Sequence, residues 1–191
     1  MCIRDRPYGR VTSSKLNRIC DVSEKYSTGR LHITTRQDIQ IHYVSIDSTP
    51  ELWAELDKDD VTIREACGNT VRNVTASETA GIDPNEPFDV TPYADATFRY
   101  MLRNPISQEM GRKFKISFSS SDEDTALSYL HDLGFIAKVK QENGEEIRGF
   151  KVLLGGGLGS QPRHGDVVYE FLPTDQIIPF IEGVVRIFDR H

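Results

Sequence analysis

The segment "TTRQDIQIHYV", residues 34–44, alternates polar and apolar side chains, and this alternation decides how the first part of the chain is expected to fold. Successive side chains of an extended strand point to opposite faces, so one face is expected to carry Arg36, Asp38, Gln40 and His42. The other face is apolar enough to be buried and carries Gln37, Ile39, Ile41 and Tyr43. Taken alone, the segment is most simply a half-buried antiparallel strand with a wet outer face, although the same polar row could line a ligand site.

The residues around this segment predict a ferredoxin-like α+β unit over residues 1–60. A helix is expected at 13–26, with Thr12 or Ser13 as its N-cap and Gly29 as its stop. Strands are expected at 31–34 and 38–44, followed by a helix at 48–56. The acidic stretch 57–60 is the expected boundary. The opening hexapeptide 1–6 fits no periodic pattern and is left out of this unit, whose first strand is expected to have been cut away.

Residues 61–191 predict a second unit, of α/β type with a mixed sheet. Helices are expected at 91–104, with Thr91 as cap, at 121–134, where Ser121 and Asp124 resemble a capping box, and at 177–188, which carries an apolar stripe. Strands are expected at 113–119, 135–141, 147–154 and 167–173. The second and third of these flank Asn143-Gly144 and should form a hairpin, with a loop longer than the minimal turn.

Composition narrows the classes of function. The chain has 191 residues and a formal net charge of −6, which argues against broad binding of a nucleic-acid backbone. No apolar run approaches the roughly 18 residues of a membrane span, and no secretory signal is evident. The three cysteines lie far apart, so neither a disulfide framework nor a metal site is predicted, and Cys67 is expected to be a small buried hydrophobe. A reducing, cytoplasmic setting fits best.

Three further motifs could carry chemistry. Lys113 and Lys115 share a face of the predicted strand 113–119 about 7 Å apart, and their repulsion is roughly 0.6 kcal/mol in water but roughly 2.4 kcal/mol in a sheltered setting. A sheltered pair therefore calls for an anion, whereas a solvated strand face is the plain alternative. Arg72 could clamp a carboxylate or oxyanion, or could be an ordinary surface arginine. The glycines at 155–157 could bring backbone N–H groups close to a ligand, or could simply form a tight turn.

Four blocks occur in order along the chain: "LHITTRQDIQIH" at 31–42, "NTVRNV" at 69–74, "GRKFKI" at 111–116 and "GFKVLLGGGLG" at 149–159. Together they resemble the nitrite and sulfite reductases that use siroheme and an iron–sulfur cluster. The similarity runs from about Pro7 to the end and corresponds to the N-terminal half of a family built as two related halves. It implies a ferredoxin-like nitrite/sulfite reductase half-domain at 1–60, followed by an α/β siroheme-binding domain at 61–191.

The resemblance also implies a reaction, cofactors and site residues. The family reduces sulfite to sulfide or nitrite to ammonia by six electrons, which arrive from ferredoxin or another donor through a [4Fe–4S] cluster. Positions that hold the polyacidic siroheme are matched by Arg36 and Gln40. Catalytic positions around the anion are matched by Arg72, Lys113 and Lys115. Further cofactor contacts are matched by Asn73, Gly155, Gly156 and Gly157.

Three departures from the family pattern qualify the resemblance. Some members carry Arg where His32 stands, which would make one carboxylate contact weaker or pH-dependent. A further family arginine falls within the opening hexapeptide, where neither Arg4 nor Arg6 is assigned. The three cysteines cannot replace the cluster ligands, so the chain is expected to act with the C-terminal half of the same polypeptide and to be inactive alone. The alternative is a non-catalytic module that binds a small anion or acidic ligand.

Overall fold

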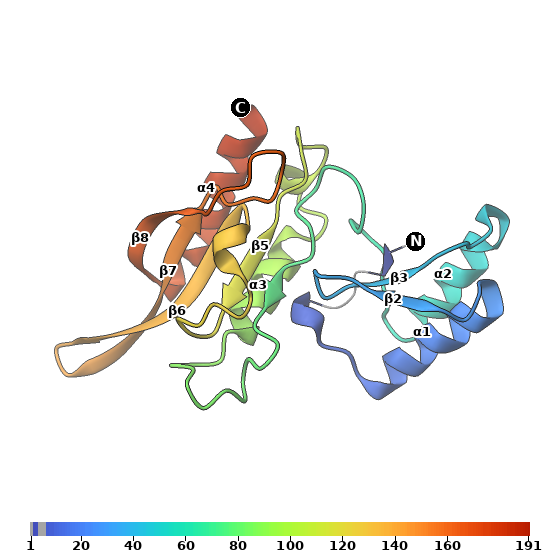
Figure 1. The fold of residues 1–191 in the computed structure, drawn as a ribbon, viewed down its shortest axis with the longest axis horizontal. Helices are drawn as coiled ribbons and strands as arrows, with labels where there is room; N and C mark the ends of the chain where they lie inside the picture. Colours follow the sequence, from blue (N-terminus) through green and yellow to red (C-terminus); the bar gives the residue numbers. More distant parts are fainter. Residues whose placement is uncertain (1, 4–6) are drawn as a thin grey trace.

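The computed structural model describes residues 2–3 and 7–191 and shows two units side by side (Figure 1). The first unit contains strands β1 (Cys2–Ile3), β2 (Leu31–Ile33) and β3 (Ile39–Ile41), helices α1 (Ser13–Tyr26) and α2 (Thr49–Asp57), and 3₁₀ turns η1 (Pro7–Gly9) and η2 (Ile46–Ser48). The strands form an antiparallel sheet in the order β1-β3-β2. Ile39 and Ile41 of β3 pack with apolar residues of α1 and α2, so the two helices cover one face of this sheet.

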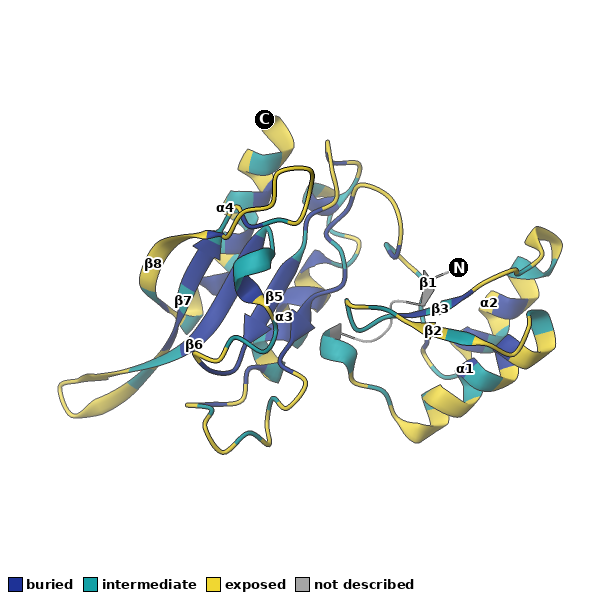
Figure 2. Cartoon of the chain, in the orientation of Figure 1, coloured by how far each residue is buried: buried dark blue, intermediate teal, exposed yellow. Residues whose placement is uncertain are grey.

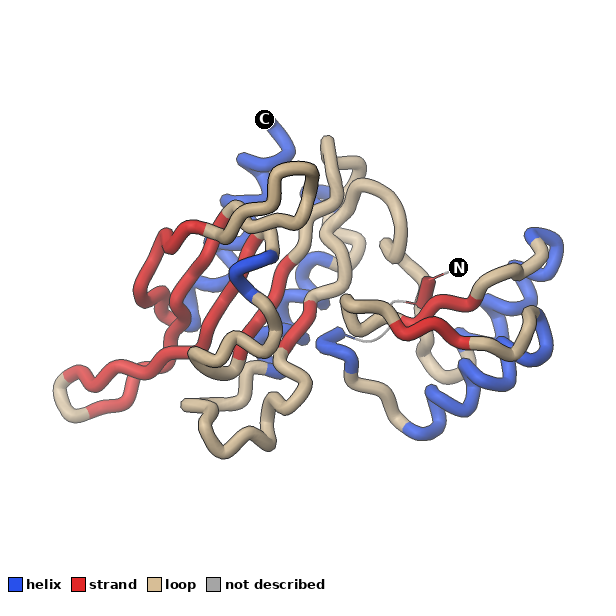
Figure 3. Tube along the Cα trace, in the orientation of Figure 1, coloured by secondary structure: helices blue, strands red, loops and turns tan. Residues whose placement is uncertain are grey.

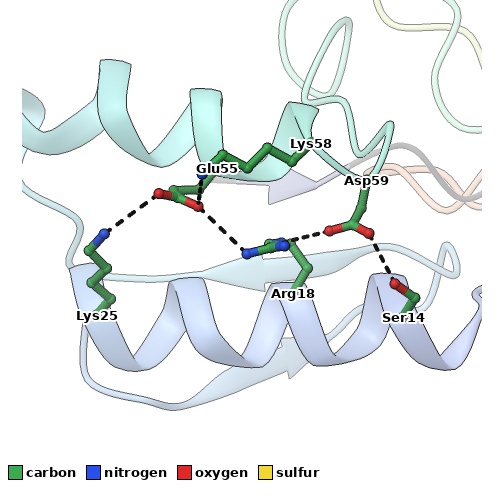
Figure 4. Close-up of polar contacts among 6 residues, drawn as sticks. All are labelled: Ser14, Arg18, Lys25, Glu55, Lys58 and Asp59. Atoms are coloured by element: carbon green, nitrogen blue, oxygen red, sulfur yellow. Dashed lines mark hydrogen bonds and ion pairs between the residues drawn. The ribbon is translucent and has the colours of Figure 1, made fainter.

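Both predicted helices of this unit are confirmed. The hydroxyl of Thr12 accepts a hydrogen bond from the backbone N–H of Lys15 at 3.3 Å, so Thr12 caps α1. Arg18 joins α1 to α2, donating to Asp59 at 2.6 Å and lying 3.6 Å from Glu55 (Figure 4). The adjacent guanidinium holds the pKa of Asp59 below its ordinary value. These ion pairs join α1 to α2 and to the residues directly after α2, at the partly exposed edge of the buried apolar cluster.

The segment 34–44 departs from the expected strand. Strand β3 covers only Ile39–Ile41, and residues 34–38 form the turn of a hairpin in which the backbone N–H of Thr34 donates to Asp38 O at 2.9 Å. Arg36 therefore lies in a turn and not on a strand face with Gln40, because strict alternation applies only to extended backbone. Cys2 and Ile3 of the opening hexapeptide were wrongly left out of the fold, since they form β1, which pairs with β3. Arg4 and Arg6 lie outside the described residues.

The second unit is built on a mixed sheet, as predicted, but the sheet has five strands where four were expected. Its strands are β4 (Thr75–Ala76), β5 (Ile116–Ser119), β6 (Leu133–Glu142), β7 (Glu145–Leu154) and β8 (Asp166–Pro173), in this spatial order. β4, β5 and β6 run parallel to one another, and β7 runs antiparallel to both β6 and β8. Figure 3 shows these strands in red beside the helices in blue. Two helices, α3 (Thr91–Met101) and α4 (Ile177–Arg190), accompany the sheet, with 3₁₀ turns η3 (Pro105–Ser107), η4 (Ser128–Leu130) and η5 (Thr174–Gln176).

The core of the second unit is aromatic. Phe118 stacks on Phe135 with ring centroids 4.7 Å apart, and Phe150 meets both rings edge-on. Apolar residues of α3 and α4 belong to the same cluster, and central β5, β6 and β7 are buried over much of their length (Figure 2). The predicted apolar stripe of α4 is confirmed. No helix in the described part of the chain is long and apolar enough to cross a membrane.

The polar face of β5 is buried because the strand lies inside the sheet and is covered by η4. Ser117 and Ser119 are fully buried, and the hydroxyl of Ser128 in η4 lies 3.0 Å from that of Ser117 and 3.2 Å from that of Ser119. The solvated-face interpretation is wrong for these two serines. Lys113 and Lys115 precede the strand, so they do not belong to its regular alternation.

Residues 121–134 do not form the expected helix. Asp124 and Leu127 adopt left-handed backbone angles, with φ of 51° and 55°, and only the single turn η4 is helical. The Asp124 carboxylate accepts hydrogen bonds from the Ser119 hydroxyl at 2.5 Å and from the backbone N–H of Ser128 at 2.7 Å. In a capping box the Asp124 carboxylate would accept from the backbone N–H at the start of its own helix. Here the carboxylate binds a side chain of β5 instead, and the helix does not form.

Two turn predictions also need correction. The β6–β7 hairpin closes with the minimal two-residue turn, Asn143-Gly144, in which both residues have positive φ. Thr91 is the first residue of α3 and not its N-cap, a position taken by Val90. The carboxylate of Asp89 accepts from the backbone N–H and the hydroxyl of Thr91, both at 2.8 Å, and so supplies the cap from one residue further away.

Candidate anion-binding site

The turn between β2 and β3 carries Arg36 to the second unit. The Arg36 guanidinium donates to the backbone carbonyl of Asn73, and the Asn73 side chain donates to the Arg36 carbonyl at 3.0 Å. Arg36 and Asn73 come from separate sequence blocks and were both predicted site residues, so the fold has brought them together. The turn extends from the small sheet toward the second unit (Figure 1).

Lys115 lies close enough to Arg36 for their charges to interact. Burial lowers the pKa of Lys115, the Asp132 carboxylate opposes that shift, and the positive charges of Arg36, Lys113 and Arg112 lower the pKa further. The backbone N–H of Lys115 donates to the Asp132 carboxylate at 2.9 Å, which fixes the start of β5 against the start of β6. The sequence prediction that Lys113 and Lys115 would need an anion if sheltered applies most directly to Lys115.

His131 and Asp132 join this group although neither was predicted. Burial, reinforced by the charge of Arg36, lowers the pKa of His131 to about 4, so its imidazole is neutral at pH 7. With Nδ1 assigned as the donor, the ring donates to the Leu127 carbonyl at 2.8 Å. Burial raises the pKa of Asp132, against the effect of Lys115. A helix was expected over both residues, and no local sequence signal distinguishes them.

A second group of cations surrounds Arg72. A cavity of about 250 Å³ is lined by Arg72, Arg112 and Lys113, together with Gly68 and Asn69. Arg72 donates to the carbonyl of Ala66, but its buried Nε has no hydrogen-bond acceptor within the described part of the chain. Among residues 2–3 and 7–191, no carboxylate lies within 4.0 Å of the charged nitrogens of Arg72, Arg112 or Lys113. Cations without counterions around a cavity can bind an oxyanion.

The glycine loop contacts Asp132, whose carboxylate accepts from the backbone of Lys115. The backbone N–H of Gly155 donates to the Asp132 carbonyl at 2.9 Å, and Gly157 exchanges two 3.0 Å backbone hydrogen bonds with Arg163. A Cβ on Gly156 would lie 2.3 Å from the Tyr129 carbonyl oxygen and 2.6 Å from that of His131. Close packing against another backbone segment therefore accounts for this glycine, and a role of the loop in cofactor contact stays a prediction.

The remaining predicted residues lie on the small sheet and in the loop that follows α2. Gln40 is in β3 opposite His32, on the face away from the buried Ile39 and Ile41, and its cofactor role stays a prediction. His32 and His42 share that face, with Nδ1 and Nε2 at 3.2 Å. Cys67 is exposed, so its predicted burial is wrong. No group of three or more His, Cys, Asp or Glu in the described part of the chain could hold a metal ion.

Comparison with known proteins decides the family. The family model described as the nitrite and sulphite reductase 4Fe-4S domain matches residues 67–191, and the nitrite/sulfite reductase ferredoxin-like half domain matches residues 6–59. The chain belongs to the nitrite and sulfite reductase family. The predicted family and fold class are thereby confirmed, and the Arg36, Arg72 and Lys115 blocks all fall within the matched segments.

Individual members show the same relationship. An assimilatory ferredoxin-dependent nitrite reductase of Haloferax mediterranei is 32% identical over 96% of this chain and 33% of its own length. A sulfite reductase [ferredoxin] of Mycolicibacterium paratuberculosis is 27% identical over 97% of this chain and 33% of its own length. The structure of the NirA protein of Mycobacterium tuberculosis aligns over 99% of this chain and 34% of that chain, with a TM-score of 0.89 and 26% identity. The chain thus spans about a third of the length of these relatives.

Proposed function

We propose that this chain supplies the siroheme- and anion-binding side chains of a nitrite or sulfite reductase. The observation that carries the proposal is the cavity lined by Arg72, Arg112 and Lys113, three cationic side chains without a carboxylate partner among the described residues; Lys115 follows Lys113 in the chain but does not line this cavity. In this proposal sulfite or nitrite is held by Arg72, Lys113 and Lys115. The macrocycle is contacted by Arg36, Gln40, Asn73, Gly155, Gly156 and Gly157.

The residues present fit such a ligand. The buried Nε of Arg72 lacks an acceptor in the described part of the chain, and a carboxylate or oxyanion would satisfy it. Siroheme supplies the redox-active iron when it is bound. The chain's own task is to hold the anion and its protons: the ammonium groups of Lys113 and Lys115 stabilise negative charge and can donate protons to oxygen that leaves as water. Neutral His131 adds no charge to this group at pH 7.

The iron–sulfur cluster requires a different source of ligands. A [4Fe–4S] cluster is held by four cysteine thiolates, and this chain has three cysteines, of which the exposed Cys67 and the half-buried Cys20 are both free. We assign the cluster ligands to a C-terminal half of the same polypeptide and electron delivery to ferredoxin or a similar donor in the cytoplasm. The isolated chain is then expected to bind its ligands without turning them over.

Absorption titration of the 191-residue chain with siroheme tests the proposal. Arg36→Ala and Lys115→Met should each weaken binding about tenfold, the expected loss for one charge-assisted hydrogen bond. Lys140→Met is the matched control, because Lys140 lies on β6 near its turn, at the opposite end of the strand from the site. It should change affinity by less than about twofold, since a distant exposed charge is screened. Equal losses in Lys115→Met and Lys140→Met would overturn the assignment.

A non-catalytic anion-binding module is the second candidate. The cavity of about 250 Å³ is large enough for an oxyanion, so the chain could bind such an anion without a tetrapyrrole. Calorimetric titration with sulfite and nitrite, without siroheme, addresses it. Two results together would favour the module over the reductase. The unmodified chain would bind the anion but not siroheme, and Arg72→Ala would abolish the binding of the anion.

A further inference from the structure

Gln37, the neighbour of Arg36 in the β2–β3 turn, makes a two-bond contact with the backbone of the second unit. Its side-chain Nε2 donates to the Ala76 carbonyl at 2.7 Å, and the backbone N–H of Ala76 donates to Gln37 Oε1 at 3.2 Å. A side-chain amide presents a donor and an acceptor next to each other, as a peptide group does. The glutamine therefore occupies the place that a neighbouring strand would take.

Ala76 offers this contact because β4 is the edge strand of the five-stranded sheet. The next residue, Ser77, donates its backbone N–H to Phe118 O in β5 at 3.0 Å, so the polar groups of Ala76 point to the free edge. Ala76 is nevertheless fully buried. Buried backbone groups must be paired, and Gln37 pairs both of them.

The surrounding backbone is arranged to admit this side chain. Gln37 itself has a φ of 59°, a left-handed conformation that costs free energy for a residue other than glycine and persists only when the surroundings hold it. Gly9 passes so close that a Cβ there would lie 3.0 Å from the Cβ of Gln37. The residue before it, Tyr8, donates its backbone N–H to Val74 O at 2.9 Å, on the same strand edge.

We propose that Gln37 is a positioning residue: by pairing with the free edge of β4 it fixes the turn that holds the Arg36 guanidinium against the backbone of Asn73. The proposal rests on the proposed role of Arg36 in ligand binding. The side-chain amide fixes the orientation of the turn as well as its position, because its N–H must meet the Ala76 carbonyl and its oxygen must meet the Ala76 N–H. Asn73, which pairs with Arg36 itself, is the second anchor of the same turn.

The test compares Gln37→Ala and Gln37→Glu with the same two changes at Gln141, an exposed residue of β6. In Gln37→Ala, siroheme affinity should fall about tenfold, and hydrogen exchange at the Ala76 amide should accelerate by at least about tenfold. A protonated glutamic acid retains one donor and one acceptor, whereas its carboxylate faces the Ala76 carbonyl without a donor. The siroheme affinity of Gln37→Glu, divided by that of the unmodified chain at the same pH, should therefore be lowest at pH 8 and should rise as the pH falls toward the ordinary glutamic acid pKa of about 4.3. The Gln141 variants should show no such trend.

A double-mutant cycle separates positioning from general stabilisation. If Gln37 acts through Arg36, then Gln37→Ala should cost little further affinity in an Arg36→Ala background. Additive losses, or unchanged exchange at the Ala76 amide in Gln37→Ala, would overturn the proposal. Absence of siroheme binding by the unmodified chain would overturn the proposed function instead, and the exchange at Ala76 would still decide whether Gln37 holds the turn.

Discussion

Replacing Gly156 by alanine should destabilise the protein, whereas the same change at Gly157 should not. The added Cβ at Gly156 would lie 2.3 Å from the carbonyl oxygen of Tyr129, and ordinary contacts begin near 3.4 Å, so backbone must move by 1.1 Å. That carbonyl already accepts a 2.8 Å hydrogen bond from the backbone N–H of Gly165, so movement would also strain that bond. Overpacking of this kind costs about 1–3 kcal/mol, and two opposing carbonyls place Gly156→Ala near the upper end.

Urea unfolding and thermal unfolding, both followed by far-ultraviolet circular dichroism, measure the difference in stability. A loss of about 3 kcal/mol should lower the thermal midpoint by roughly 6–12 °C for a chain of this size. Gly157 is the control, because nothing lies within 4 Å of the position that its Cβ would take and its φ is not left-handed. Gly157→Ala should stay within about 0.5 kcal/mol of the unmodified chain. Equal unfolding midpoints for the two variants would refute the argument that close packing, and not ligand contact, requires glycine at 156.

Three further changes test other parts of the structure. Lys115→Met should weaken siroheme binding without lowering the midpoint of urea unfolding. Burial lowers the pKa of Lys115, which means that the charged ammonium group costs free energy in the folded protein. A lower urea midpoint with unchanged siroheme affinity would contradict the site. At His131 the unfolded chain binds more protons than the folded one between pH about 4 and 6.5, the folded and ordinary pKa values of this residue. Stability from neutral His131 is thus complete above pH 6.5 and is lost toward pH 4, by up to roughly 3 kcal/mol, and His131→Asn should flatten this dependence in urea titrations. Asp89→Ala should cost about 1 kcal/mol by removing the cap of α3, and Asp89→Asn should retain most of it.

Local sequence determined those elements whose signals needed no distant partner. The helix at 13–26 follows from a capping hydroxyl at Thr12 and apolar residues at helical spacing, and the stripe of α4 buries its own face against whatever sheet is available. The Asn143-Gly144 pair specifies a turn with two positive φ angles, so the β6–β7 hairpin was predictable to within its loop length. The ordered sequence blocks were also sufficient to indicate the family.

Tertiary structure decided the elements whose side chains are used over long distances. Asp124 could have capped a helix at 121–134, but it binds Ser119 of β5 instead, and the segment became irregular. The alternating pattern allowed Ser117 and Ser119 to lie on a solvent-exposed strand face, but η4 covers both side chains in the folded protein. In both cases a hydrogen bond between segments competes with the local pattern, and the local pattern carries no information about that bond.

The candidate site divides in the same way. The resemblance to the family identified Arg36, Arg72 and Lys115 as candidates, whereas residue type alone left an ordinary surface arginine and a solvated strand face as open alternatives. Only the fold shows that the Arg36 turn meets Asn73, and that burial perturbs Lys115 and His131 together. Burial and electrostatic interaction depend on distances between segments that the chain brings together in space, so the sequence determined which charges exist and the tertiary structure determined which of them share one environment.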